Sequence, residues 1–207
     1  MARFLLVHGA WHGGWCFAEV ARELTRRGHL VETPDLPCEE LGLTQHDYAR
    51  LVGPQPDAVV LGHSLGGQTV ALVEARVRVY LGAILPVETV YADSFAEGFG
   101  GFVRDGLGRS YWPDEEACAA GMYPDCTREQ SDRAFAQLRR QAPFDAIANP
   151  FEADDVVFVT GRDAAVDPDW QRRTALAHGL KVVELDTGHS PFFTHPVELA
   201  DALESVA

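Results

Sequence analysis

The sequence has little positive charge and almost no lysine. Its 207 residues include 17 lysines and arginines against 31 aspartates and glutamates, giving a formal net charge of −14. Such an acidic chain cannot displace counterions from a phosphate backbone, so we expect no nucleic-acid partner, and the acidity favours solubility. Lys181 is the only lysine and stands at the start of a predicted strand, which makes it a poor Schiff-base candidate.

Long apolar runs and closely spaced cysteine pairs are also missing. No run approaches the roughly 20 apolar residues of a membrane-spanning helix. The first apolar run is too short for a signal peptide and no small-residue cleavage site follows it. The four cysteines form no C-x-x-C pair, which argues against a zinc site or a redox dithiol. We therefore expect a cytoplasmic protein with free thiols and without a metal, a cofactor or a membrane partner; the pattern does not indicate an oligomeric state.

Short β-rich runs alternate with helix-like stretches along most of the chain. The chain is 46% hydrophobic, which suits one domain with a sizeable core. The alternation predicts an α/β fold with a mostly parallel sheet of about six strands and helices on both faces. Several runs are continuously apolar, as in strands covered on both sides. The predicted strands are residues 3–8, 30–33, 58–62, 79–85, 156–160 and 181–185, and the predicted helices are residues 15–27, 64–76, 168–178 and 196–206.

This alternation stops between residues 86 and 150. The region is rich in aromatic residues, glycines and charges, shows no strand pattern, and predicts helices only over 114–123 and 131–142. A long aromatic insertion after one strand suits a lid over a site at the strand ends; the alternative is a surface excursion whose aromatic residues pack on themselves. We predict a core made of residues 1–85 and 151–207 and a small inserted cap over 86–150.

A serine between two glycines gives the first chemical signal. Gly62-His63-Ser64-Leu65-Gly66 matches G-x-S-x-G and falls between a predicted strand and a predicted helix, which is the setting of a nucleophile elbow. The flanking positions must lack side chains so that strand and helix can pack closely around a strained turn. The helix dipole also favours negative charge at this point. The pattern therefore predicts Ser64 as a nucleophile, with an ordinary glycine turn as the alternative.

A serine hydroxyl needs a base to take its proton. His189, in TGHSPFFTHPVELA, follows the last predicted strand and can reach the serine across the end of a parallel sheet. His195 is the rival, but it precedes Pro196 at a predicted helix start, where a local structural role is expected. We predict His189 as the base.

The base needs an acid that orients it. Asp163 lies just beyond the predicted strand 156–160 and is our candidate. Asp167 is second, since it resembles a helix N-cap ahead of a proline. Asp186 is too close in sequence to His189 to turn back on that ring. The order serine, aspartate, histidine is that of α/β-hydrolases.

Acyl transfer also needs backbone N–H donors for the oxyanion. One is expected from Leu65, directly after the nucleophile, and the other from Ala10 in the loop HGAWHGGW that follows the first predicted strand. This loop does not fit the dinucleotide pattern G-x-G-x-x-G. His8 and His12 are four residues apart, but the glycine-rich stretch has no glutamate, so a helical zinc pair is not expected.

Together these stretches resemble the α/β-hydrolase superfamily. LLVHGAWHGGWCF and LGHSLGG resemble the branch that holds plant methylesterases, hydroxynitrile lyases and bacterial relatives, and the likeness covers about residues 1–85 and 155–207. The resemblance implies an α/β-hydrolase fold with Ser64, Asp163 and His189 as triad, Ala10 and Leu65 as oxyanion donors, and His12 with the adjacent Trp11 near the pocket.

Two departures from that branch limit what the resemblance implies. The hydroxynitrile lyases need a lysine directly after the catalytic histidine, where this chain has Ser190, so cyanohydrin cleavage is disfavoured. The chain is also shorter than is usual for the group, chiefly in the cap and between residues 34 and 58, so substrate specificity does not carry over. A serine at position 64 excludes the relatives that use an aspartate nucleophile.

We therefore expect a serine hydrolase that cleaves a small apolar or aromatic carboxylic ester through an acyl-enzyme on Ser64. Two alternatives remain open: a non-catalytic small-molecule binding or signalling protein on the same fold, and a thioesterase or lactonase that uses the same serine.

Overall fold

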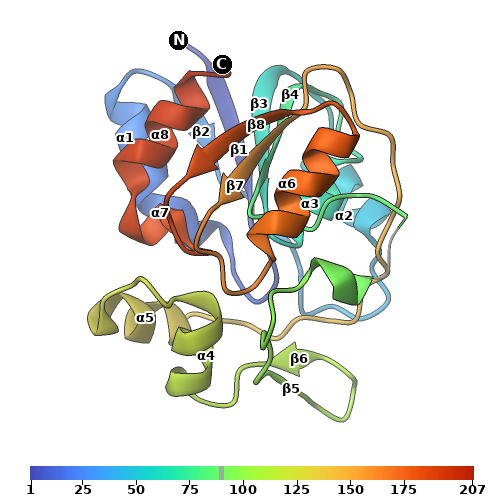
Figure 1. Ribbon diagram of the computed structural model, residues 1–207, viewed down its shortest axis with the longest axis vertical. Helices are drawn as coiled ribbons and strands as arrows, with labels where there is room; N and C mark the ends of the chain where they lie inside the picture. Colours follow the sequence, from blue (N-terminus) through green and yellow to red (C-terminus); the bar gives the residue numbers. More distant parts are fainter. Residues whose placement is uncertain (89–90) are drawn as a thin grey trace.

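Six parallel strands form the centre of the molecule (Figure 1). The structure is a computed structural model that describes residues 1–88 and 91–207. The strand order is β2-β1-β3-β4-β7-β8, and every neighbouring pair is parallel, which confirms the predicted sheet. The strands are β1 (Arg3–Val7), β2 (Leu30–Glu32), β3 (Gln55–His63), β4 (Ala75–Leu81), β7 (Val156–Thr160) and β8 (Lys181–Leu185).

Alternate side chains of each strand enter two separate hydrophobic layers, since successive Cβ atoms point to opposite faces of a sheet. Along β1, Phe4 and Leu6 join one layer, whereas Leu5 and Val7 join the other. The first layer is covered by α1 and α8, and the second by α2, α3 and α6 (Figure 1). The bounds are α1 (Ala18–Arg26), α2 (Gln45–Val52), α3 (Gly66–Val70), α6 (Pro168–Ala177), α7 (Pro191–Thr194) and α8 (Pro196–Glu204), with a 3₁₀ turn η1 (Gly14–Phe17) before α1.

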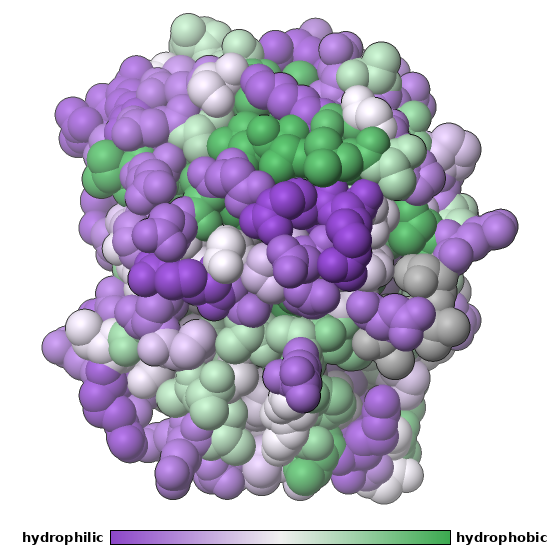
Figure 2. Space-filling view, in the orientation of Figure 1, coloured by the Kyte–Doolittle hydropathy of each residue, from purple (hydrophilic) through white to green (hydrophobic). Residues whose placement is uncertain are grey.

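Strand β8 forms one edge of the sheet. On the face drawn in Figure 2, which is otherwise mostly hydrophilic, apolar side chains gather over the region where Figure 1 places β8. Lys181 and Glu184 are exposed on the strand itself, and such charges discourage edge-to-edge pairing. No helix in the described part of the chain is long and apolar enough to span a bilayer.

Helices α2 and α3 and strand β4 differ most from the sequence prediction. Helix α2 was not predicted, although Thr44 and Asp47 form a capping box at its start, a pattern that the sequence contains. Strand β4 occupies Ala75–Leu81 rather than 79–85, because Gly82 adopts φ +50° and ends it. Helix α3 accordingly stops at Val70 and not at residue 76.

The insertion, residues 86–150, lies at the carboxyl ends of the strands, away from both chain termini (Figure 1). The expectation that it has no strands is wrong: β5 (Val103–Arg104) and β6 (Ser110–Tyr111) pair as an antiparallel hairpin. Two helices follow, α4 (Glu115–Met122) and α5 (Arg128–Phe135), after a 3₁₀ turn η2 (Tyr91–Ser94). Helix α5 begins before the predicted residue 131 because Thr127 and Gln130 form a capping box there.

Candidate active site

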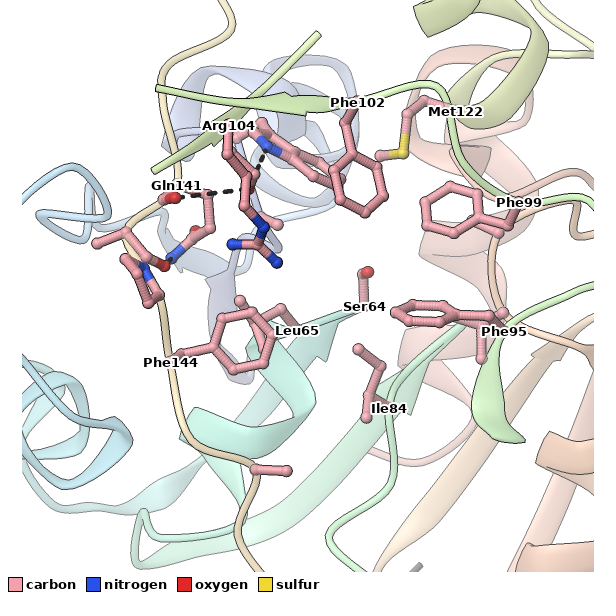
Figure 3. Close-up of a pocket in the computed structure, with 18 of the residues that line it drawn as sticks. Ser64, Leu65, Ile84, Phe95, Phe99, Phe102, Arg104, Met122, Gln141 and Phe144 are labelled. Atoms are coloured by element: carbon pink, nitrogen blue, oxygen red, sulfur yellow. Dashed lines mark hydrogen bonds between the residues drawn. The ribbon is translucent and has the colours of Figure 1, made fainter. Parts of the chain in front are cut away.

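Ser64 occupies a strained turn between β3 and α3. Its φ is +52°, a left-handed conformation that non-glycine residues adopt mainly where function requires it. The flanking glycines are needed for close packing: a Cβ on Gly62 would lie 2.5 Å from the Gly66 carbonyl oxygen, and one on Gly66 would lie 2.7 Å from the His8 carbonyl oxygen. The local sequence therefore forces the serine hydroxyl outward, toward the pocket that Figure 3 shows.

Asp163 and His189 form a buried hydrogen-bonded pair. The Nδ1–H of His189 donates to Oδ2 of Asp163 at 2.8 Å, and neither side chain is accessible to solvent. Asp163 also accepts the Thr160 hydroxyl at Oδ2, at 2.6 Å, and the backbone N–H groups of Ala165 and Val166 at Oδ1, at 2.8 and 2.9 Å. Such hydrogen bonds stabilise the ionised carboxylate in a buried place, so the ring is held by an acceptor of fixed orientation.

The other ring nitrogen of His189 has no hydrogen-bond partner. Nε2 is buried and, within the described residues, neither donates nor accepts a hydrogen bond. The ring lies 4.6 Å, centroid to centroid, from the ring of His63, which directly precedes Ser64. The structure thus joins Asp163 to His189 and brings the ring beside the serine turn, but it forms no hydrogen bond between His189 and Ser64. Catalytic hydrogen bonds are often long in ligand-free structures and tighten when substrate binds.

His189 differs from the three other buried histidines of the site. His8, His12 and His63 each donate one ring N–H to a backbone carbonyl. Burial lowers the pKa of His8 to about 4 and that of His12 to about 3, and it also lowers the pKa of His63. These three rings are therefore neutral near pH 7. Of the four, only the His189 ring is hydrogen-bonded to a carboxylate, which is the contact that stabilises an imidazolium.

The two backbone N–H groups predicted for the oxyanion lie in the same lining as Ser64. Ala10 and Leu65 both line the cavity, and within the described residues their N–H groups donate to no protein acceptor. The loop of Ala10 is held from behind: His12 Nδ1–H donates to the Ala10 carbonyl at 2.9 Å, and the Tyr123 hydroxyl donates to His12 Nε2 at 2.7 Å. The next residue, Trp11, adopts φ +65°.

A cavity of about 410 Å³ opens in front of Ser64 (Figure 3). Trp11 belongs to its lining, whereas His12 does not. His12 is fully buried behind the loop, where both of its ring nitrogens are engaged, so it lies near the pocket and supports the loop without lining the cavity. Most of the lining comes from the insertion and is apolar; it includes Phe95, Phe99, Phe102, Met122, Pro143 and Phe144.

The insertion also contacts the residues directly before and after His189 in the sequence. The Ser190 hydroxyl donates to the Met122 carbonyl oxygen at 3.0 Å, and the Gly188 N–H donates to Asp125 Oδ2 at 2.7 Å. These contacts and that of Tyr123 were not predicted. Tyr123 and His12 are 111 residues apart, and no local sequence pattern predicts a contact between residues so far apart.

The rival residues lie elsewhere and have local partners. His195 shares a hydrogen bond with the Thr194 side chain at 2.7 Å and stands between α7 and α8. Asp167 caps α6 by accepting the Asp169 N–H at 2.9 Å. Asp186 is exposed on the surface. Of the three candidate aspartates, Asp163 is therefore the one bonded to His189. Within the described residues, no group of three or more His, Cys, Asp or Glu side chains is placed to hold a metal ion.

Comparisons with known proteins identify the family of the chain. The model of a family described as the alpha/beta hydrolase family matches residues 4–202. Methylesterase 7 of Arabidopsis thaliana is 26% identical over 99% of this chain and 96% of its own length. A carbendazim hydrolyzing esterase of Nocardioides sp. (strain SG-4G) is 37% identical over 42% of this chain and 43% of its own length.

Solved structures show the same fold. A pyrethroid hydrolase from Sphingobium faniae JZ-2 superimposes with a TM-score of 0.75 and covers 99% of this chain and 96% of its own. Its sequence identity is 23%, so this likeness concerns the fold alone.

Proposed function

The chain belongs to the alpha/beta hydrolase family, and on this premise we propose that it is a serine esterase that cleaves a small apolar or aromatic carboxylic ester through an acyl-enzyme on Ser64. The observation that carries the proposal is the buried Asp163–His189 pair: the His189 ring lies beside His63 of the serine turn, and its Nε2 has no partner among the described residues. The esterases among the relatives, on methyl esters and on carbendazim by their names, support the same reaction class.

In the proposed reaction, Ser64 Oγ attacks the ester carbonyl carbon while His189 Nε2 takes the hydroxyl proton. The carbonyl oxygen becomes an oxyanion, which the N–H groups of Ala10 and Leu65 stabilise. The carbon–oxygen bond to the alcohol then breaks, and His189 returns the proton to the leaving alkoxide. Water, deprotonated by the same ring, attacks the acyl-enzyme and releases the acid and Ser64.

Asp163 orients this ring and balances its charge. Its bond to Nδ1–H fixes the tautomer in which Nε2 has the free lone pair, and its negative charge stabilises the imidazolium that forms. The neutral state of His8, His12 and His63 adds no positive charge that would oppose this protonation.

The cavity supports a small substrate with an apolar body. Its volume is about 410 Å³, and phenylalanine side chains surround the space in front of Ser64 (Figure 3). Apolar walls with a few polar groups are typical of small-molecule sites. Thioesters and lactones undergo the same acyl transfer, so they belong in the substrate panel.

The test is hydrolysis of a panel of p-nitrophenyl esters, aryl methyl esters, a thioester and a lactone by the wild type and Ser64→Ala. We expect Ser64→Ala to lower kcat by at least about 10⁴-fold, as for serine hydrolases that lose a triad member. Ser205→Ala, on the exposed end of the chain, is the matched serine control and should be unchanged. Hydrolysis that survives in Ser64→Ala would contradict the mechanism, and flat inactivity of the wild type on the whole panel would favour a binding protein.

A further inference from the structure

Arg104 brings a positive charge into a pocket that is otherwise mostly apolar. It lies on β5 of the insertion hairpin and lines the cavity together with Ser64. In Figure 3 its guanidinium points into the space in front of Ser64 and faces the side of the pocket formed by Phe95 and Phe99. The guanidinium is tethered from the hairpin turn, because Nη1 donates to the Gly108 carbonyl oxygen at 3.1 Å.

No carboxylate in the described part of the chain pairs with this charge. Within residues 1–88 and 91–207 Arg104 forms no ion pair, although the chain has 31 acidic residues. Two arginines of the same insertion, Arg109 and Arg140, both pair with Asp105, at 2.9 and 2.6 Å. Asp145 is the other charged residue of the lining; it is exposed and is not paired with Arg104. The guanidinium therefore keeps N–H donors free for a ligand.

We propose that Arg104 selects esters that carry a free carboxylate in addition to the scissile ester, on an apolar or aromatic body. This inference rests on the proposed function and names the substrate class. A guanidinium matches a carboxylate with two parallel N–H···O bonds. Arg104 is exposed in the free protein, so its attraction for the carboxylate strengthens when the substrate body displaces water from the phenylalanine-lined cavity.

The test compares two esters of one acid, the monomethyl and dimethyl esters of 1,4-phenylenediacetic acid. Their methylene groups separate the two carbonyl functions, so the esters differ mainly in charge. The measurement is the ratio of kcat/KM for the monoester to that for the diester. We expect Arg104→Gln to lower this ratio about tenfold, chiefly through KM, because the lost contact binds ground state and transition state alike.

Two further variants separate charge from shape. Arg104→Lys keeps the charge but loses the bidentate geometry, so its ratio should lie between those of the wild type and Arg104→Gln. Arg76→Gln is the matched control, since Arg76 is also an exposed arginine without an ion pair among the described residues, at the start of β4, and it should leave the ratio unchanged. Added salt should reduce the wild-type ratio more than that of Arg104→Gln.

Binding is measured independently of turnover, by calorimetry of the monoester on Ser64→Ala with and without Arg104→Gln. An affinity about tenfold weaker without Arg104 supports the inference. The inference is overturned if Arg104→Gln leaves the wild-type ratio unchanged. It is also overturned if Ser64→Ala does not bind the monoester, or binds it equally well with and without Arg104. Ester hydrolysis that survives in Ser64→Ala contradicts the proposed function instead, so the two failures are distinguishable.

Discussion

Asp163→Asn changes one atom of the proposed relay, and the structure fixes which atom. Oδ1 accepts the N–H groups of Ala165 and Val166, so the oxygen of the asparagine amide must stay there. The amide nitrogen then takes the place of Oδ2, opposite His189 Nδ1. It would donate to Nδ1, and the ring would carry its proton on Nε2 instead.

With a proton on Nε2, His189 cannot accept one from Ser64. We therefore expect Asp163→Asn to lower kcat by about 10³–10⁴-fold, which corresponds to roughly 4–5.5 kcal/mol of transition-state stabilisation. The assay is release of p-nitrophenolate from an ester that the wild type hydrolyses, with substrate saturating. Because the replacement is isosteric and the Thr160 hydroxyl can accept from the new amide, the fold should remain intact by circular dichroism.

Asp167→Asn and Asp186→Asn are the matched controls. Asn caps a helix as well as Asp does, so α6 keeps its start in the first, and the second changes an exposed side chain. Both should retain nearly full activity. If Asp163→Asn keeps kcat within about tenfold of the wild type, or if either control loses as much as it does, the assigned relay is refuted.

Two further predictions concern stability. The pKa of His8 is about 4 in the folded chain, against an ordinary value of 6.5. Between these two pH values His8 binds a proton in the unfolded chain but not in the folded one. The folded state is therefore most stable above pH 6.5 and loses stability as the pH falls toward 4. His8 should account for about 2 kcal/mol of the decrease in the free energy of unfolding, measured in urea, between pH 7 and pH 5. The pKa values of His12 and His63 are lowered as well, so His8→Gln should make the dependence less steep by about that amount without abolishing it; an equally steep dependence in the variant would contradict the prediction. Gly62→Ala should lower the free energy of unfolding by about 2–3 kcal/mol, because its Cβ would lie 2.5 Å from the Gly66 carbonyl oxygen. Gly100→Ala, whose Cβ would have no atom within 4 Å, should change it by no more than about 0.5 kcal/mol. Equal thermal midpoints for the two glycine variants would be incompatible with the tight turn.

Much of the core and of the candidate site could be predicted because short local sequence patterns determine them. Carboxyl ends of parallel strands meet at one edge of the sheet, so a serine turn after one strand and an acid and a histidine after two others converge there. Asp163 and His189 are in contact in the structure. Ser64 has the strained φ that a G-x-S-x-G turn implies.

The insertion could not be predicted to the same extent, because its order depends on contacts that are distant in the sequence. The hairpin that presents Arg104 has strands of two residues each, too short for a period-2 pattern. Its position depends on pairing with distant segments, as when Ser110 and Gln141 exchange backbone hydrogen bonds at 2.8 Å. The same holds for Tyr123 behind His12. The charged feature that we assign to substrate selection thus lies in the least predictable part of the chain.

The most direct measurement of the central claim is covalent labelling with a fluorophosphonate probe, followed by peptide mapping by mass spectrometry. The probe reacts with serine hydroxyls that a neighbouring base has activated. We predict an adduct on Ser64 in the wild type and none in Ser64→Ala, with much slower labelling in His189→Ala. An adduct on a different serine, or unchanged labelling of Ser64 after removal of the His189 ring, would contradict the account.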